Sequence, residues 1–255
     1  MRIVRFLAGG QPVHGLVDDD TVYYLDGSPF GPFTRGAPAD TLNRAELLVP
    51  CVPTKIVAIG RNYAEHAKEH RAEVPVEPLI FLKPPSALVA HRQPVVLPPQ
   101  SNQVEHEAEL AIVIGRRAKG VDRDDAWKYV LGSTCVNDVT ARDLQRSDGQ
   151  WSRAKGFDTF CPLGPWIETG LTPEQIGGLD VTCRVNGLTR QAGNTRDMVF
   201  DVPRLIAHIS AAMTLEPGDV ILTGTPAGVG PLVDGDTVEV EIESIGVLRN
   251  SVKKP

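Results

Sequence analysis

Residues 104–115 constrain the fold more than any other stretch of the chain. Residues 110–114 of this segment form an unbroken apolar run, which predicts a β-strand buried on both faces. A strand of this kind needs apolar layers on both sides. The chain has 255 residues, 42% of them hydrophobic, and is therefore long enough to bury a sizeable core around it.

Other strand signals outnumber helical ones and do not alternate regularly with them, which predicts a strand-dominated α+β fold rather than a doubly wound sheet. Residues 1–50 are expected to form a small β-rich domain, and residues 51–255 the main domain. Within the first, the pattern predicts a meander, followed by a linker at 27–54 with a short polar helix near 40–47. In the second, we expect strands at 55–59 and 133–139 and helices at 63–71, 125–130 (capped by Asp122) and 202–213.

Charge and cysteine content exclude several functions. The net charge is −6 and no basic stripe occurs, so a nucleic-acid partner is not expected. The four cysteines are widely spaced and predict buried free thiols rather than a zinc site. No apolar run of 18 residues and no signal-peptide pattern is present, so we expect a cytoplasmic protein without a membrane partner.

Two carboxylates in the key strand point to a metal site. Glu107 and Glu109 are two residues apart, so they project to the same side of a strand. Their mutual repulsion at the edge of a core calls for a cation, although a solvated strand face is the ordinary explanation of such a pair. Glu105 shares that face, and periodicity alone does not decide which two of the three bind metal.

A third carboxylate, Asp138, is expected at the end of the strand predicted at 133–139, with Asp143 as a rival. Three carboxylates without Cys or His ligands favour a hard ion such as Mg²⁺ or Mn²⁺.

Other candidate groups are weaker signals. His66 and Glu69 are neighbours on one helix face, a spacing that suits a general base but is more often a surface contact. Lys155 is a candidate cation for an anionic substrate, or a solvated lysine. The glycine-rich segment 223–230 lacks the Lys-Ser/Thr of a phosphate-binding loop, so a nucleotide site is rejected.

Five motifs taken together, in this order and spacing, resemble the fumarylacetoacetate hydrolase family over about residues 53–252. They are Gly60-Arg61-Asn62-Tyr63 with His66 and Glu69, Glu107-x-Glu109-Leu110, the stretch 137–143, Lys155-Gly156-Phe157-Asp158, and Thr223-Gly224-Thr225-Pro226. The resemblance implies a mixed β-sandwich roll, usually dimeric, with a small N-terminal domain.

The resemblance also implies residue roles. It makes Glu107, Glu109 and Asp138 the ligands of Mg²⁺, with Mn²⁺ or Ca²⁺ as substitutes, and leaves Glu105 and Asp143 out. It makes His66 and Glu69 a dyad on a mobile lid. Contacts to substrate or oxyanion fall to Gln145, Lys155 and Thr225. Apart from the resemblance, Arg61, Arg142 and Arg153 are unranked candidates for a second substrate carboxylate.

The function implied is metal-dependent chemistry on small anionic 2-oxo acids. One alternative is an isomerase or decarboxylase of the 2-hydroxyhepta-2,4-diene-1,7-dioate type in aromatic catabolism. The other is a C–C hydrolase of acylpyruvates, and the two are near parity. A non-catalytic metal-binding paralogue is a third possibility, against which the retained dyad and Lys155 argue.

Overall fold

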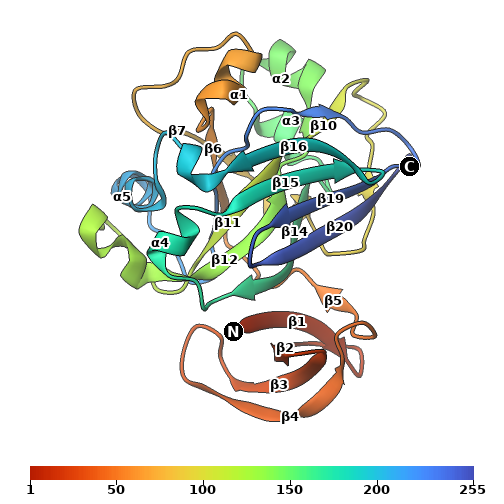
Figure 1. The fold of residues 1–255 in the computed structure, drawn as a ribbon, viewed down its shortest axis with the longest axis vertical. Coiled ribbons are helices and arrows are strands. Elements are labelled where there is room, and N and C mark those ends of the chain that lie inside the picture. Colours follow the sequence, from red (N-terminus) through yellow and green to blue (C-terminus); the bar gives the residue numbers. More distant parts are fainter.

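The computed structural model describes residues 1–255 and shows a strand-dominated α+β protein, as predicted. The strands form three sheets, and short helices lie around them (Figure 1). The helices are α1 (Ala64–Glu69), α2 (Arg142–Asp148), α3 (Ser152–Gly156), α4 (Pro173–Ile176), α5 (Val202–Ala212), and the 3-10 helices η1 (Pro85–Ala87), η2 (Arg123–Tyr129) and η3 (Thr195–Asp197).

The largest sheet contains twelve strands. They are β1 (Arg2–Ala8), β2 (Gln11–Asp18), β3 (Thr21–Gly27), β4 (Phe33–Thr41), β5 (Leu47–Leu48), β6 (Ile56–Gly60), β7 (Leu79–Lys83), β8 (Leu88–Val89), β11 (Ala108–Ile114), β12 (Val130–Asn137), β14 (Cys161–Glu168) and β17 (Val220–Leu222). The main path runs β4-β3-β2-β1-β14-β12-β11-β17-β6-β7, with β5 beside β1 and β8 beside β14. The sheet is mixed, because β17 pairs with β6 in parallel while β11 pairs with β12 and β17 in the antiparallel sense.

Two smaller sheets complete the body. A five-stranded sheet has the order β16-β15-β19-β20-β9, formed by Leu188–Asn194, Asp180–Val185, Thr237–Ile242, Gly246–Lys253 and Val95–Val96. A three-stranded sheet has the order β13-β10-β18, formed by Thr140–Ala141, Val104–His106 and Gly230–Pro231. In Figure 1 strands β15, β19 and β20 lie across β11, β12 and β14, so two sheets pack face to face.

The apolar run in β11 is buried on both faces, as the sequence predicts. Leu110, Ile112 and Ile114 pack into a core cluster shared with β15 and β19. Ala111 and Val113 point the other way, into a second cluster shared with β6, β14 and β17. Strand alternation therefore divides one sequence run between two cores.

The predicted strand 104–115 is not continuous, however. It breaks at Glu107, so that β10 joins the three-stranded sheet and β11 the large one. The Glu107 amide donates to Asn137 Oδ1 at 2.9 Å, and its carbonyl accepts from the Asp138 amide, also at 2.9 Å. This exchange satisfies the backbone at the break and brings Glu107 beside Asp138.

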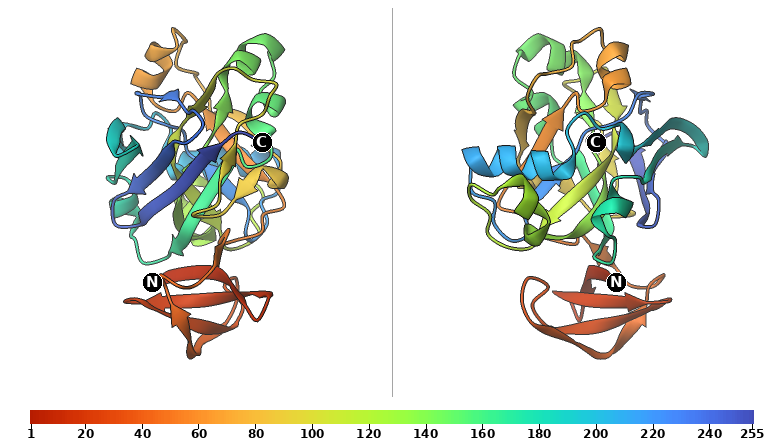
Figure 2. Two further views of the ribbon diagram at one scale, coloured as in Figure 1. Left: turned by 90° about the vertical axis from the view of Figure 1, so that its right-hand side faces the viewer. Right: turned by 60° about the vertical axis from the view of Figure 1, so that its left-hand side comes forward.

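The N-terminal strands β1 to β4 lie at one end of the molecule, where Figures 1 and 2 show them below the main body. The linker and helix expected within residues 27–54 are wrong. Strand β4 pairs with β3 from Thr41 opposite Thr21 to Phe33 opposite Gly27. Where the helix was expected, β4 ends at Thr41, residues 42–45 form a turn, and Leu47 pairs with Phe6 of β1. Pro38 is tolerated because β4 is an edge strand.

The predicted helices at 63–71 and 202–213 correspond to α1 and α5. The cap predicted at Asp122 is wrong, because η2 is a 3-10 helix and the Asp122 side chain makes no capping hydrogen bond. The longest helix, α5, has 11 residues, and no helix has both the length and the apolarity needed to cross a membrane. Helices α1, α2 and α3 gather at the end of the molecule opposite the N-terminal strands (Figure 2).

Asp219 ties the parallel strands β6 and β17 together at their start. Although it is fully buried, its carboxylate accepts hydrogen bonds from the Thr54 amide and hydroxyl at 2.9 and 2.8 Å, and from the Glu216 amide at 2.8 Å. The Lys55 ammonium also contacts it. Burial opposes ionisation, but these donors hold the pKa of Asp219 below its ordinary value.

We therefore expect Asp219→Ala to lower the free energy of unfolding by roughly 3 kcal/mol at pH 7, because a buried ion pair loses one partner. Chemical denaturation measures this, with Asp124→Ala as the control at an exposed aspartate. Equal stability of both variants would show that Asp219 does not hold the two strands.

Candidate active site

Three buried carboxylates converge where β12 ends and β11 begins. Glu107, Glu109 and Asp138 are 4%, 2% and 1% exposed, and one oxygen of each lies within 4.8 Å of the others. The convergence expected from the sequence is therefore present. Glu105 and Asp143 lie outside this group.

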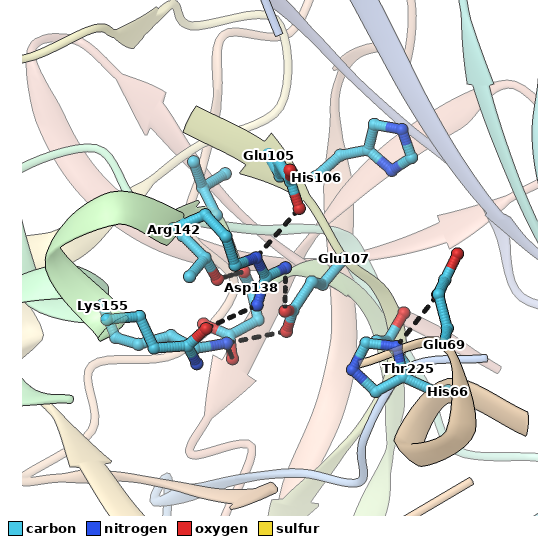
Figure 3. Close-up of polar contacts among 12 residues, drawn as sticks. His66, Glu69, Glu105, His106, Glu107, Asp138, Arg142, Lys155 and Thr225 are labelled. Carbon is cyan, nitrogen blue, oxygen red and sulfur yellow. Dashed lines mark hydrogen bonds and ion pairs between the residues drawn. The ribbon is translucent and has the colours of Figure 1, made fainter. Parts of the chain in front are cut away.

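Two lysines lie against the carboxylates. Lys155 Nζ, from α3, donates to Glu107 Oε2 at 2.7 Å and to Asp138 Oδ2 at 2.6 Å (Figure 3). Lys83 Nζ, at the end of β7, donates to Asp138 Oδ1 at 2.5 Å and to the Phe160 carbonyl at 2.9 Å. Both lysines are buried, so their charges are matched by the carboxylates rather than by water.

Arg142, the first residue of α2, is the third cation. Its Nε donates to Glu105 Oε2 at 2.9 Å, and its NH2 donates to Glu107 Oε1 at 2.7 Å (Figure 3). Its NH1 donates to Gln145 Oε1 at 2.7 Å. Arg142 thus neutralises Glu105 and fixes one oxygen of Glu107. Its charge is therefore already matched by two carboxylates, Glu105 and Glu107.

The cluster carries one more negative charge than positive, and the excess falls on Glu109. The four buried carboxylates are matched by three cations, and Glu109 is the one carboxylate with no ion-pair partner. Its only hydrogen bond comes from the Gly224 amide at 2.7 Å. Burial, together with the charges of Asp138 and Glu107, raises the pKa of Glu109 well above its ordinary value.

Glu107 behaves oppositely. It is equally buried, yet Lys155 and Arg142 outweigh burial and hold its pKa below its ordinary value. The residues present therefore fit a divalent cation, for which Glu107, Glu109 and Asp138 offer an all-oxygen donor set of the kind preferred by hard ions. Such an ion would remove the uncompensated charge on Glu109.

A cleft of about 270 Å³ opens onto the carboxylates. All of the residues proposed from the sequence as site residues line it except Glu69 and Arg153, and Trp151 and Phe81 form an apolar wall. Arg61 lies there with its guanidinium 6.0 Å from the Trp151 ring, and it has no carboxylate partner. Arg153 is instead paired with Asp148 at 2.5 Å.

Helix α1 places His66 at the mouth of the cluster. The side chain is buried, and burial lowers the pKa of the imidazole, with Glu107 opposing the shift. His66 Nδ1 lies 3.5 Å from Glu69 Oε2, which is longer than a normal hydrogen bond, and Nδ1 has no hydrogen-bond partner (Figure 3). Both Glu69 oxygens accept from the Gly228 amide at 3.2 Å. The two residues are neighbours as expected, but not hydrogen-bonded.

Thr225 belongs to a fixed network behind the carboxylates. Its hydroxyl donates to the Ala108 carbonyl at 2.8 Å and accepts from Gln191 Nε2 at 2.7 Å. Gln191 Oε1 in turn accepts from the Ala108 amide at 3.0 Å and lies 3.0 Å from His106 Nδ1. The Thr225 hydroxyl proton is therefore already donated to a backbone carbonyl and is not available to a substrate.

Sequence reasoning missed Lys83 and Gln191. Lys83 directly follows the apolar run 79–82, and this position indicates that the charged side chain enters a core. Its partner Asp138, however, lies 55 residues further along the chain. Nothing in the sequence around Gln191 indicates a site residue, because β16 is largely exposed and, of its side chains, only Gln191 turns inward to the site.

A mixed-sheet body whose cleft ends on a buried carboxylate cluster is the arrangement that the sequence motifs predict. A family model described as fumarylacetoacetate (FAA) hydrolase C-terminal matches residues 55–253, and one described as Rv2993c-like, N-terminal matches residues 1–50. The chain belongs to the fumarylacetoacetate hydrolase family.

Its relatives include enzymes of several kinds. The human mitochondrial oxaloacetate tautomerase FAHD2A is 48% identical over 78% of this chain and 67% of its own length. The structure of 2-hydroxyhepta-2,4-diene-1,7-dioate isomerase from Mycobacterium marinum is 43% identical, with a TM-score of 0.92 over 100% of this chain and 98% of that one. Fumarylacetoacetate hydrolase from Exiguobacterium antarcticum is 35% identical, with a TM-score of 0.90 over 100% of both chains.

Because of the charge imbalance, we expect substitutions of Glu107 and Glu109 to change the free energy of unfolding in opposite directions. In metal-free protein, at a pH above the raised pKa of Glu109, Glu109→Gln should raise the free energy of unfolding by about 1 kcal/mol, because it removes an unpaired buried charge. Glu107→Gln should lower it by roughly 3 kcal/mol, because Lys155 and Arg142 lose their partner. Denaturation in EDTA measures both.

The pH dependence supplies the control. The raised pKa of Glu109 stabilises the metal-free fold below the ordinary value of 4.5, and this contribution is lost as pH rises through the raised pKa. Glu109→Gln should lack that part of the pH profile. A profile unchanged from wild type would refute the assignment of the excess charge to Glu109.

Proposed function

We propose that this protein is a Mg²⁺-dependent enzyme that moves protons in enolisable 2-oxo or 2-hydroxy-diene carboxylic acids, as an isomerase or tautomerase. The observation that carries this proposal is the pairing of an unneutralised carboxylate cluster with a neutral imidazole on one cleft. Glu107, Glu109 and Asp138 would hold the ion, and His66 lines the same cleft. The tautomerase and isomerase relatives support the same reading.

His66 would act as the general base. Its lowered pKa keeps the imidazole neutral near pH 7, so it accepts a proton without first losing one. It would take the proton from the carbon beside the 2-oxo group, whose C–H electrons form a C=C bond while the 2-oxygen becomes an enolate. Returning the proton to the oxygen or to another carbon completes a tautomerisation or an isomerisation. When bound, a divalent cation supplies Lewis-acid stabilisation of charge on the substrate oxygens.

Two side chains have donors to spare for the substrate. Lys155 uses two of its three ammonium protons on Glu107 and Asp138, which leaves one for an oxyanion. Gln145 accepts from Arg142 through Oε1, which orients its amide NH₂ outward as a donor. Thr225 has no such proton, so its proposed role is to line the site rather than to donate.

Arg61 is the residue we propose for a distal carboxylate. Of the three arginines considered from the sequence, Arg142 is paired with Glu105 and Glu107, and Arg153 with Asp148. Of these three, only Arg61 lines the cleft without an acidic partner. Arg146, which also lines it, donates to Gln103 Oε1 at 2.6 Å. The substrate class favoured is accordingly a dicarboxylate with a 2-oxo group at one end.

Hydrolysis of acylpyruvates is the second candidate, because His66 and Glu69 are both present and adjacent, as water activation requires. The 3.5 Å separation and the free Nδ1 make the pair a less ordered base for water than a hydrogen-bonded dyad. Decarboxylation of oxaloacetate would use the same enolate. The homodimer and the cytoplasmic location remain predictions.

The first test is turnover of oxaloacetate, 2-hydroxyhepta-2,4-diene-1,7-dioate and an acylpyruvate, each with Mg²⁺ and with EDTA, followed by absorbance and NMR. We expect Mg²⁺-dependent conversion of an enol to its keto isomer without carbon loss. Release of two carboxylic acids would assign hydrolysis instead, and release of CO₂ decarboxylation. No turnover of any of them, with Mg²⁺ bound, would favour the non-catalytic alternative.

The second test addresses the base. His66→Ala should slow proton transfer by about 10²- to 10⁴-fold while Mg²⁺ affinity stays unchanged, because the imidazole moves the proton and is not an ion ligand. Solvent deuterium exchange into the substrate measures this directly, with His208→Ala on α5 as the control. Exchange at the wild-type rate in His66→Ala would exclude the histidine as the base.

A further inference from the structure

Helix α1 carries a second group of potential metal ligands, separate from the three carboxylates. His66, Glu69 and His70 each offer a ligand atom within 4.8 Å of those of the other two. Their spacing of three and four residues puts all three side chains on one face of the helix. The rings of His66 and His70 meet edge to face, with centroids 4.7 Å apart.

This group has an unsatisfied atom at its centre. His66 is 7% exposed, yet Nδ1 has no hydrogen-bond partner. An unpaired buried polar atom costs free energy, and such atoms are rare in folded proteins. The nitrogen lies 3.5 Å from Glu69 Oε2, too far for a good hydrogen bond and close enough for both atoms to share an ion.

Two imidazoles and one carboxylate form a donor set unlike that of the carboxylate cluster. Imidazole ligands suit Zn²⁺ and its transition-metal neighbours, whereas oxygen ligands alone suit Mg²⁺. His66 and His70 line the cleft, so water can occupy the fourth position of a four-coordinate ion. Glu69 can keep its bond from the Gly228 amide while it ligates, because a carboxylate has several acceptor positions.

We propose that His66, Glu69 and His70 form an inhibitory site for Zn²⁺ or a related transition-metal ion. An ion bound to His66 Nδ1 withdraws electron density from the imidazole, which makes the ring a weaker base toward the substrate. Mg²⁺ and Zn²⁺ then act in opposite senses through two sites on one cleft. The inhibition rests on the proposed role of His66 as the base, whereas the binding does not.

Both histidines are already in the form that binds metal. Burial lowers the pKa of each imidazole, so neither has to lose a proton near pH 7. The carboxylate of Glu69 supplies one negative charge toward the ion. Glu65 and Lys68 of the same helix contact each other at 3.6 Å and are exposed, so they are not part of the site.

Binding is tested with Co²⁺, which absorbs strongly in the visible range when four-coordinate with imidazole ligands and weakly when octahedral with oxygen ligands. We expect one equivalent of Co²⁺ added to the full-length protein, saturated with Mg²⁺, to give the strong spectrum. His70→Asn should weaken Co²⁺ affinity by at least about tenfold. His70 is exposed, so this change leaves the fold intact.

Two control variants locate the ion. Glu65→Gln, on the same helix, and Glu109→Gln, in the carboxylate cluster, should both keep the strong spectrum. Its persistence in His70→Asn, its loss in Glu109→Gln, or its absence from the wild type would each overturn the site.

Inhibition is then measured separately. Zn²⁺ should inhibit Mg²⁺-dependent turnover, and His70→Asn should require at least about tenfold more Zn²⁺ for half inhibition, relative to its own uninhibited rate. Equal inhibition of both proteins would overturn the regulatory part. If no substrate turns over, the cobalt spectrum still decides whether the site exists, so failure of the proposed function is distinguishable from failure of this inference.

Discussion

The unequal neutralisation of four buried carboxylates is the constraint on which the rest of this structure depends. Lys83, Lys155 and Arg142 cancel three charges and leave the fourth on Glu109. Each cation comes from a different element, so β7, α2 and α3 are drawn to one end of the molecule by the charges at the start of β11. Burying an incomplete set of charges costs stability, and a bound cation would offset that cost.

Apolar packing on both faces of the large sheet offsets this cost in stability. Strand β11 lies inside the sheet between β12 and β17, and its side chains enter an apolar core on each face. Glu107 stands where the chain leaves one sheet for another, with its backbone satisfied by Asn137 and Asp138. The site is thus fixed by main-chain geometry before any side chain adjusts, which is the preorganisation that electrostatic catalysis requires.

Much of this could be predicted from local sequence. The apolar run of β11 and the two-residue spacing of Glu107 and Glu109 depend on strand geometry, and both expectations hold. The break at Glu107 could not be predicted, because it depends on Asn137, thirty residues away. Likewise the partner of Lys83 and the inward turn of Gln191 follow from which strands become neighbours. The helix expected near residues 40–47 failed for the same reason, since one end of that segment pairs with β3 and the other with β1.

The proposed ligands and the proposed base are held by very different amounts of structure. The ligands sit at the ends of central strands, whereas His66 is carried by a six-residue helix whose Glu69 is bound to the facing loop by the Gly228 amide alone. Substitutions in α1 and its flanking loops can therefore alter which substrate is accepted, or where its proton goes, without disturbing the carboxylate cluster. Because the carboxylates and the proposed base are held by separate parts of the structure, the reaction type can diverge while the core stays constant. This is consistent with tautomerase, isomerase and hydrolase relatives sharing one architecture.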